Sequence, residues 1–100
     1  MPRLYEYLGI IILFHSNEHE PIHVHGRHQD RESKAEIIVH DGKVIDVNIV
    51  LTKAKPLTGT QKNNFETFVR HYADEIVQSW IDYFVLHKKI TPQKITERIK

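Results

Sequence analysis

The sequence has no cysteine among its 100 residues. This absence excludes disulfide bonds and thiolate ligands, so a transition metal would have to be held by histidine, aspartate or glutamate. Glycine and proline occur only four times each, and the chain contains no internal repeat, no low-complexity tract and no linker. We therefore expect a single domain.

No hydrophobic run approaches the length of a membrane span. The longest, residues 8–14 (LGIIILF), is far shorter than the roughly 20 residues that cross a bilayer. The start of the chain has no apolar segment followed by a small-residue cleavage site, so we expect a cytoplasmic protein with no secretion signal and no membrane association. Net charge is +1, but the first half of the chain is acidic and the second half basic. The basic tail could contact nucleic acid or an acidic partner, although a solvated tail is more common.

Hydrophobic patterns predict the fold class. Residues 8–14 are typical of a central strand, residues 22–29 alternate as in a half-buried strand, and residues 35–51 contain a hairpin. An apolar stripe then predicts one long helix beginning near Thr58. The stripe consists of Phe65, Phe68, Val69, Tyr72, Ile76, Trp80, Tyr83 and Phe84. We expect an α+β domain over residues 1–88, with a small antiparallel sheet of three to four strands and one long C-terminal amphipathic helix packed on one face.

Residues 29–33 are polar and predict a loop, and the hairpin that follows allows two registers near Gly42. A two-residue turn would pair charged with apolar side chains across the strands. A three-residue loop, residues 40–42, instead places Ile37 opposite Ile45 and keeps the apolar side chains on one face. Because a slip of one residue reverses every side chain, we predict the three-residue loop, with Gly42 at positive φ.

Residues 89–100 are predicted to be a basic extension of the domain. Thr91 followed by Pro92 can start a short helix. Ile95 and Ile99 are four residues apart and could dock weakly on the body of the protein. We therefore expect this extension to lie outside the hydrophobic core.

Residues 15–26 (HSNEHEPIHVHG) concentrate four histidines and two glutamates. His23 and His25 are two residues apart on a predicted strand, so their imidazoles share a face. The preceding loop adds further side chains of the same kinds, including His15. Two or three histidines with a carboxylate suit zinc, nickel or iron. The candidate ligands of a divalent transition metal are His19, His23, His25 and Glu18.

The same histidines also allow chemistry without a metal. Imidazole titrates near neutrality and can act as general acid and general base. Arg27 and Arg31 follow closely and could hold phosphate. His23 and His25, assisted by His19, could then cleave RNA, which supplies its own nucleophile in the 2′-hydroxyl. A third interpretation is a solvated polar strand face with no chemistry, and the sequence leaves all three open.

The first quarter of the chain, MPRLYEYLGIIILFHSNEHEPIHVHG, resembles an uncharacterised family of small bacterial proteins, a domain of unknown function. The family motif reads roughly S-N-E-H-x-P-P-H-V-H after an apolar strand. The matching residues are Ser16, Asn17, Glu18, His19, Pro21, His23, Val24 and His25. Ile22 stands where the family usually has a second proline, which loosens the inferred turn. The hairpin and a helix ending in W-x-x-Y-F are also similar, so the resemblance covers roughly residues 1–86.

The resemblance implies a biological role but no reaction mechanism. Members of the family resemble one half of a two-gene toxin–antitoxin-type module, which implies a small antitoxin-like protein partner and an activity directed at RNA. The order of strand, hairpin and helix is also faintly similar to small mRNA-cleaving toxins, at the level of fold alone. The alternative is a non-catalytic metal-binding or partner-binding module. A homo-oligomer is compatible with either.

Overall fold

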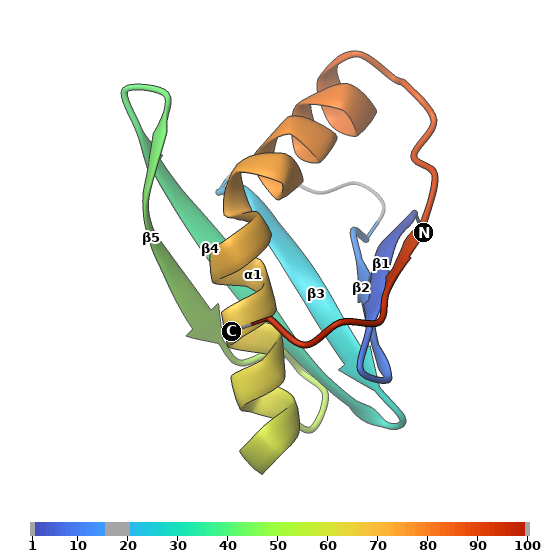
Figure 1. The fold of residues 1–100 in the computed structure, drawn as a ribbon. Helices are drawn as coiled ribbons and strands as arrows, with labels where there is room; N and C mark the ends of the chain where they lie inside the picture. Colours follow the sequence, from blue (N-terminus) through green and yellow to red (C-terminus); the bar gives the residue numbers. More distant parts are fainter. Residues whose placement is uncertain (1, 16–20, 100) are drawn as a thin grey trace.

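The computed structural model describes residues 2–15 and 21–99, which form one sheet with one long helix across a face (Figure 1). The elements are β1 (Arg3–Tyr7), β2 (Ile10–Leu13), β3 (His23–His28), β4 (Arg31–His40), β5 (Lys43–Val50), α1 (Gly59–Trp80), a π-helical segment (Ile81–Val85) and β6 (Gln93–Ile95). The strand order is β5-β4-β3-β2-β1-β6. Neighbouring strands are antiparallel except β1 and β6, which are parallel.

The sheet is larger than the sequence predicted, and the expectation of a small antiparallel sheet of three to four strands is wrong. Its six strands form a mixed sheet, while the α+β class with one long helix is correct. One of the additional strands is β1, which the apolar run of residues 8–14 concealed. Leu8 and Gly9 have φ values of 49° and 83° and form a tight turn between β1 and β2. The run is therefore a turn followed by a strand, and not one unbroken strand.

The other additional strand is β6, which lies where a short C-terminal helix was expected. It pairs in parallel with β1, with Tyr5 opposite Gln93 and Tyr7 opposite Ile95. Further along the tail, the backbone N–H of Ile99 donates a hydrogen bond of 3.0 Å to the Tyr7 hydroxyl. The tail therefore completes one edge of the sheet.

The hairpin between β4 and β5 has a two-residue turn, so the predicted three-residue loop is wrong. Val39 lies opposite Val44, and Gly42 has a φ of 78°, at positive φ as predicted. The apolar side chains nevertheless share one face, because the register shifts by one residue within the hairpin. The extra residue, Ile45, lies in a bulge and is 62% exposed. Ile37 therefore still faces the core and is buried.

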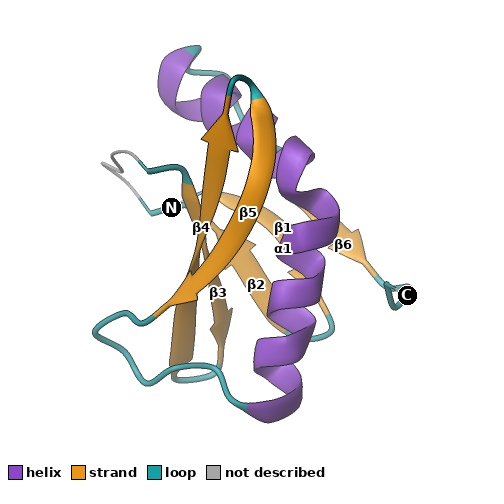
Figure 2. Ribbon diagram, turned by 90° about the vertical axis from the view of Figure 1, so that its left-hand side faces the viewer, coloured by secondary structure: helices purple, strands orange, loops and turns teal. Residues whose placement is uncertain are grey.

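The helix α1 covers one face of the sheet with the predicted apolar stripe (Figure 2). Its buried residues are Phe65, Phe68, Val69, Ala73, Ile76 and Trp80. The helix begins near Thr58 as expected, and Thr58 occupies the N-cap position, but its side chain makes no capping hydrogen bond. Beneath the helix, Gly26 of β3 lies so close to Phe65 that an added Cβ would be 2.5 Å from two ring carbons. Within the described ranges, neither helical segment has the length and apolarity needed to span a bilayer.

Candidate functional site

The two faces of β3 have different surroundings. Gly26 faces α1, since an added Cβ there would meet Phe65 of the helix. Because side chains alternate along a strand, His23 and His25 face the other side of the sheet. There His25 lies opposite Leu13 of β2 on one side and Lys34 of β4 on the other.

His23 and His25 are both buried, with 6% of each residue exposed. The interpretation of this strand face as a solvated polar surface is therefore wrong. The two rings are 5.3 Å apart between centroids, so the structure brings these two candidates together as predicted. His23 also lies 5.4 Å from the ring of Trp80, near the end of α1. Buried polar side chains need hydrogen-bond partners, and both histidines have them.

Glu32 is the centre of the cluster. Its Oε2 atom lies 3.2 Å from His25 Nδ1 and 3.4 Å from His15 Nε2. Its Oε1 atom accepts a hydrogen bond of 3.2 Å from Arg27 Nε. The rings of His15 and His25 are stacked, with centroids 3.6 Å apart and planes within 7° of parallel. One carboxylate is thus shared by two imidazoles and one guanidinium.

The hydrogen bonds determine which ring nitrogen carries a proton in two of the histidines. The carbonyl oxygen of Pro21 can only accept, so His23 Nδ1, at 2.7 Å, is the donor. A carboxylate oxygen of Glu32 is likewise the acceptor for His25, which donates to it through Nδ1. In the neutral form of each ring the lone pair therefore lies on Nε2. A hydrogen bond from Nδ1–H to an oxygen orients the imidazole ring in this way in both general-base and metal-binding histidines.

His15 differs from His25 in two respects. Its side chain is 34% exposed, so it is the more accessible ring of the stacked pair. Its Nε2 atom is nevertheless covered and has no hydrogen-bond partner among the described residues. The 3.4 Å approach to Glu32 is therefore a close electrostatic contact without the direction of a hydrogen bond.

The cluster meets one requirement of a metal site and fails another. The ligand atoms of His15, His25 and Glu32 all lie within 4.8 Å of one another. In a tetrahedral zinc site, two ligand atoms lie ~3.4 Å apart. His15 Nε2 and His25 Nδ1 lie 3.4 and 3.2 Å from Glu32 Oε2, close to this separation. An imidazole binds a metal in the plane of its ring, however, and no point lies in both planes of a parallel stack. A metal at these atoms would therefore require one ring to rotate.

The other predicted residues have separate outcomes. Glu18 and His19 lie outside the described residues. Arg27 belongs to the cluster, whereas Arg31 donates to the carbonyl of Pro56 at 3.1 Å and does not. Glu32 was missed because residues 29–33 were assigned to a loop, although they contain a two-residue turn and the start of β4. Once the β3–β4 hairpin is known, Glu32 lies directly opposite Arg27, and this opposite-charge pair is the signal that could have identified it.

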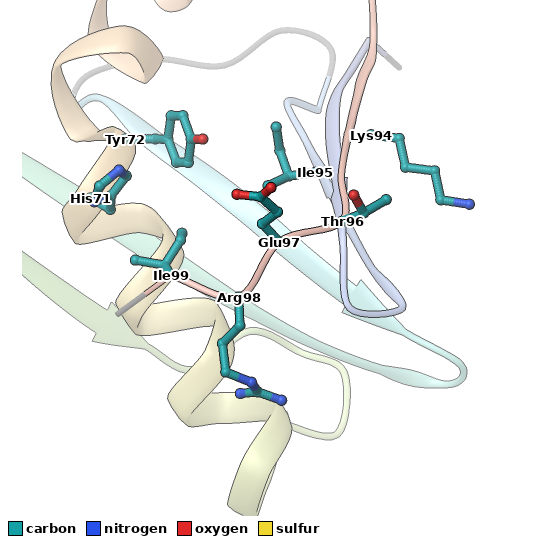
Figure 3. Close-up of a pocket in the computed structure, with 8 residues that line it drawn as sticks. All are labelled: His71, Tyr72, Lys94, Ile95, Thr96, Glu97, Arg98 and Ile99. Atoms are coloured by element: carbon teal, nitrogen blue, oxygen red, sulfur yellow. The ribbon is translucent and has the colours of Figure 1, made fainter.

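A separate cavity lies away from these histidines. It has a volume of about 490 Å³ and lies between the tail and α1 (Figure 3). Figure 3 shows Glu97 and Ile95 directed toward Tyr72, while Arg98 points away along the helix. None of the cluster residues lines this cavity, so the cavity is separate from the histidine cluster.

Comparison with known proteins identifies a family without a known activity. A family model described as "Domain of unknown function (DUF4160)" matches residues 9–81. No curated protein and no solved structure matches the chain. The matched region includes all residues of the cluster and excludes β1 and β6. The expected resemblance to an uncharacterised family is confirmed at this level.

Proposed function

The chain belongs to the DUF4160 family, and we propose that it is an RNA-cleaving component of a toxin–antitoxin-type module. The observation that most supports this is the sharing of one carboxylate oxygen by two imidazoles. His15 Nε2 and His25 Nδ1 lie 3.4 and 3.2 Å from Glu32 Oε2. In this role the protein acts in the cytoplasm and has a small antitoxin-like protein partner.

RNA cleavage requires a general base, a general acid and a group that holds phosphate. The base takes the proton of the 2′-hydroxyl, and the 2′-oxygen forms a bond to the adjacent phosphorus. The bond from phosphorus to the 5′-oxygen breaks, and the acid gives its proton to that oxygen. The products are a 2′,3′-cyclic phosphate and a 5′-hydroxyl, and no metal or external nucleophile is needed.

The stacked histidines suit the two proton-transfer roles. The two rings are 3.6 Å apart, close enough for one imidazole to act as base and the other as acid on the same phosphodiester. Glu32 accepts a hydrogen bond from His25 and orients its ring. Arg27, with 36% of its side chain exposed, is the candidate phosphate ligand.

His23 has a supporting role in this proposal. Its Nδ1–H is held by the Pro21 carbonyl at 2.7 Å, and its ring lies 5.3 Å from that of His25. It is thus a positioning residue for His25, next to the reacting groups. His19 remains a candidate on the sequence pattern alone.

The test is cleavage of a random-sequence RNA pool in the presence of a chelator. We expect His15→Ala, His25→Ala and Glu32→Gln each to lower the rate by about 10²–10⁴-fold, the usual contribution of general acid–base catalysis. His40→Ala is the matched control, because His40 lies in the distant β4–β5 hairpin and is exposed. The pH profile of the parent should be bell-shaped. The same pool with 2′-deoxy sugars should not be cleaved, because it has no 2′-hydroxyl.

Two results would contradict the acid–base proposal. One is cleavage that disappears in chelator and returns with a divalent metal. The other is cleavage that is unchanged in all three cluster variants, which would show that the activity comes from another site or from a contaminant.

The second candidate function is non-catalytic binding of a divalent transition metal. It is favoured by the ligand atoms of His15, His25 and Glu32, which lie within 4.8 Å of one another. Binding by this set would require His25 Nδ1 to give up the proton that it donates to Glu32. Calorimetric titration with zinc or nickel, without a histidine tag, would test it. Because bound imidazole must be neutral, affinity should fall as pH decreases, and a Glu32→Gln variant that binds as tightly as the parent would contradict this ligand set.

A further inference from the structure

Strand β5 forms one edge of the sheet, and the middle of this edge is blocked. The N–H of Val47 donates to Asp46 Oδ1 at 2.8 Å, and its carbonyl accepts from Arg70 Nη2 at 2.9 Å. Arg70 comes from α1 and is held in turn by Glu66, at 3.1 Å. Both backbone groups of Val47 are thus occupied by side chains, which prevents another strand from pairing there.

The register indicates that Ile49 has the same orientation as Val47. Ile37, opposite Val47, donates its N–H to the carbonyl of Ile22 on the β3 side. The Ile37–Val47 pair is therefore one without mutual hydrogen bonds, and such pairs alternate along an antiparallel ladder. The next pair of this kind is Ala35–Ile49. The N–H and carbonyl of Ile49 therefore point away from β4, and no side chain among the described residues hydrogen-bonds to them.

An apolar surface adjoins this unprotected part of the edge. Leu51, directly after β5, is 77% exposed. Together with Ile49, Pro56 and Leu57 it lines a cavity of about 320 Å³ beside the first turn of α1. We call Ile49, Leu51 and this cavity the open edge. Surface leucines are normally unremarkable when single, but one beside an apolar cavity and an unpaired strand edge resembles a binding surface.

Lysines predominate among the charged side chains around the open edge. Lys62 lines the cavity, and no acidic residue does. Lys53 follows Leu51 by two residues and is exposed. Lys55 is exposed as well and lies 3.9 Å from Asp30, a loose contact between two solvent-exposed side chains. The surroundings of the open edge therefore favour a ligand with carboxylates.

We propose that the open edge binds an extended acidic segment of a protein partner as an added β-strand. The backbone of the segment pairs with Ile49, and every second side chain faces the same side. An apolar side chain enters the cavity beside Leu51, and carboxylates lie near Lys53 and Lys62. The inference rests on the proposed function only in that a protein partner exists, since no residue of the histidine cluster takes part.

The experiment uses the full chain and a short synthetic peptide in which valine and glutamate alternate. We expect binding in an NMR titration, with shifts centred on Ile49 and Leu51 and slower amide hydrogen exchange at Ile49. Leu51→Asp should weaken binding by roughly tenfold or more, equivalent to ~1.4 kcal/mol. The matched control is Ile45→Asp, because Ile45 is an exposed apolar residue of the same strand outside the open edge, and it should leave binding unchanged.

Several outcomes would overturn the proposal. They are no binding at about 1 mM peptide, equal binding of a peptide with lysine in place of glutamate, and shifts centred elsewhere. Self-association that Leu51→Asp abolishes would identify a second copy of the chain as the occupant instead. RNA cleavage by Leu51→Asp is measured in parallel and should equal that of the parent. If the parent protein cleaves RNA but does not bind the peptide, only the open-edge proposal fails. If it binds the peptide but does not cleave RNA, only the proposed function fails.

Discussion

Gly26 gives the sharpest prediction about how the fold supports the histidine cluster. It lies on β3 between His25 and Arg27, on the face of the strand that packs against the helix. A Cβ at this position would be 2.5 Å from two ring carbons of Phe65 and 3.0 Å from a third. Phe65 is fully buried, so its ring has no open space into which to move. The substitution Gly26→Ala therefore forces the strand and the helix apart.

The expected cost combines two opposing contributions. Overpacking of a well-packed core costs typically ~1–3 kcal/mol and sometimes more. Alanine is intrinsically better than glycine in a regular strand by roughly 0.5–1 kcal/mol, which offsets part of this cost. Since the contact is with a ring enclosed on all sides, we expect Gly26→Ala to lower the free energy of unfolding by about 2 kcal/mol.

Urea unfolding of the single and double variants tests this explanation. In Gly26→Ala/Phe65→Leu the shorter side chain leaves room for the added methyl, so the two changes should be coupled by ~1 kcal/mol or more. Gly42→Ala is the control, because a Cβ there meets nothing within 4 Å and only the positive φ of 78° is strained. Changing Phe65 should not relieve that variant. A Gly26→Ala protein as stable as the parent, or strictly additive double variants, would refute the close-packing argument.

Three further predictions concern the stability of the domain. Trp80→Ala should cost ~3–5 kcal/mol, because a large buried ring leaves a cavity, and a change under ~1 kcal/mol in urea unfolding would show that this ring is not core. Burial, and then the hydrogen bond to Glu75, raise the pKa of Tyr5, so its neutral form stabilises the fold below the unfolded pKa of ~10 and this contribution is lost as pH rises above it. Tyr5→Phe should therefore flatten the decline of stability between about pH 10 and 12, as measured by unfolding at each pH, and an unchanged slope would contradict this. Removal of residues 91–100 should lower stability by about 2–4 kcal/mol, since β6 and two partly buried isoleucines are lost; an unchanged thermal midpoint would mean that the tail is peripheral.

The parts of the fold that follow from local patterns were predictable. The stripe of α1 recurs at helical spacing, and its central residues Phe68 and Ile76 are buried as expected. The parts that depend on long-range pairing were not predictable. β6 is three residues long and pairs with a strand almost ninety positions away, so nothing in its own sequence identifies it. Leu8 concealed the first turn, because leucine seldom adopts positive φ.

The hairpin shows how a correct physical requirement led to a wrong geometry. Charged and apolar side chains must be separated, and the sequence satisfies this with a bulge at Ile45 and not with a longer loop. Asp41-Gly42 is a strong signal for a two-residue turn. The prediction preferred a three-residue loop because its register did not allow for a bulge. Glu32 was missed for a different reason, because the polar residues 29–33 were assigned to a loop although β4 begins at Arg31.

Strand β3 connects the packing of the helix with the histidine cluster, because one face of the strand contacts α1 and the other carries the cluster. On one face Gly26 permits the close approach of the helix, and on the other His25 contacts Glu32 at 3.2 Å. The contacts of the cluster are short, so a displacement of β3 by a few tenths of an ångström changes them. Gly26→Ala should therefore lower RNA cleavage even though no imidazole is altered, and Phe65→Leu should restore part of it. Cleavage that stays at the parental rate while stability falls would show that the cluster is insensitive to the packing behind it.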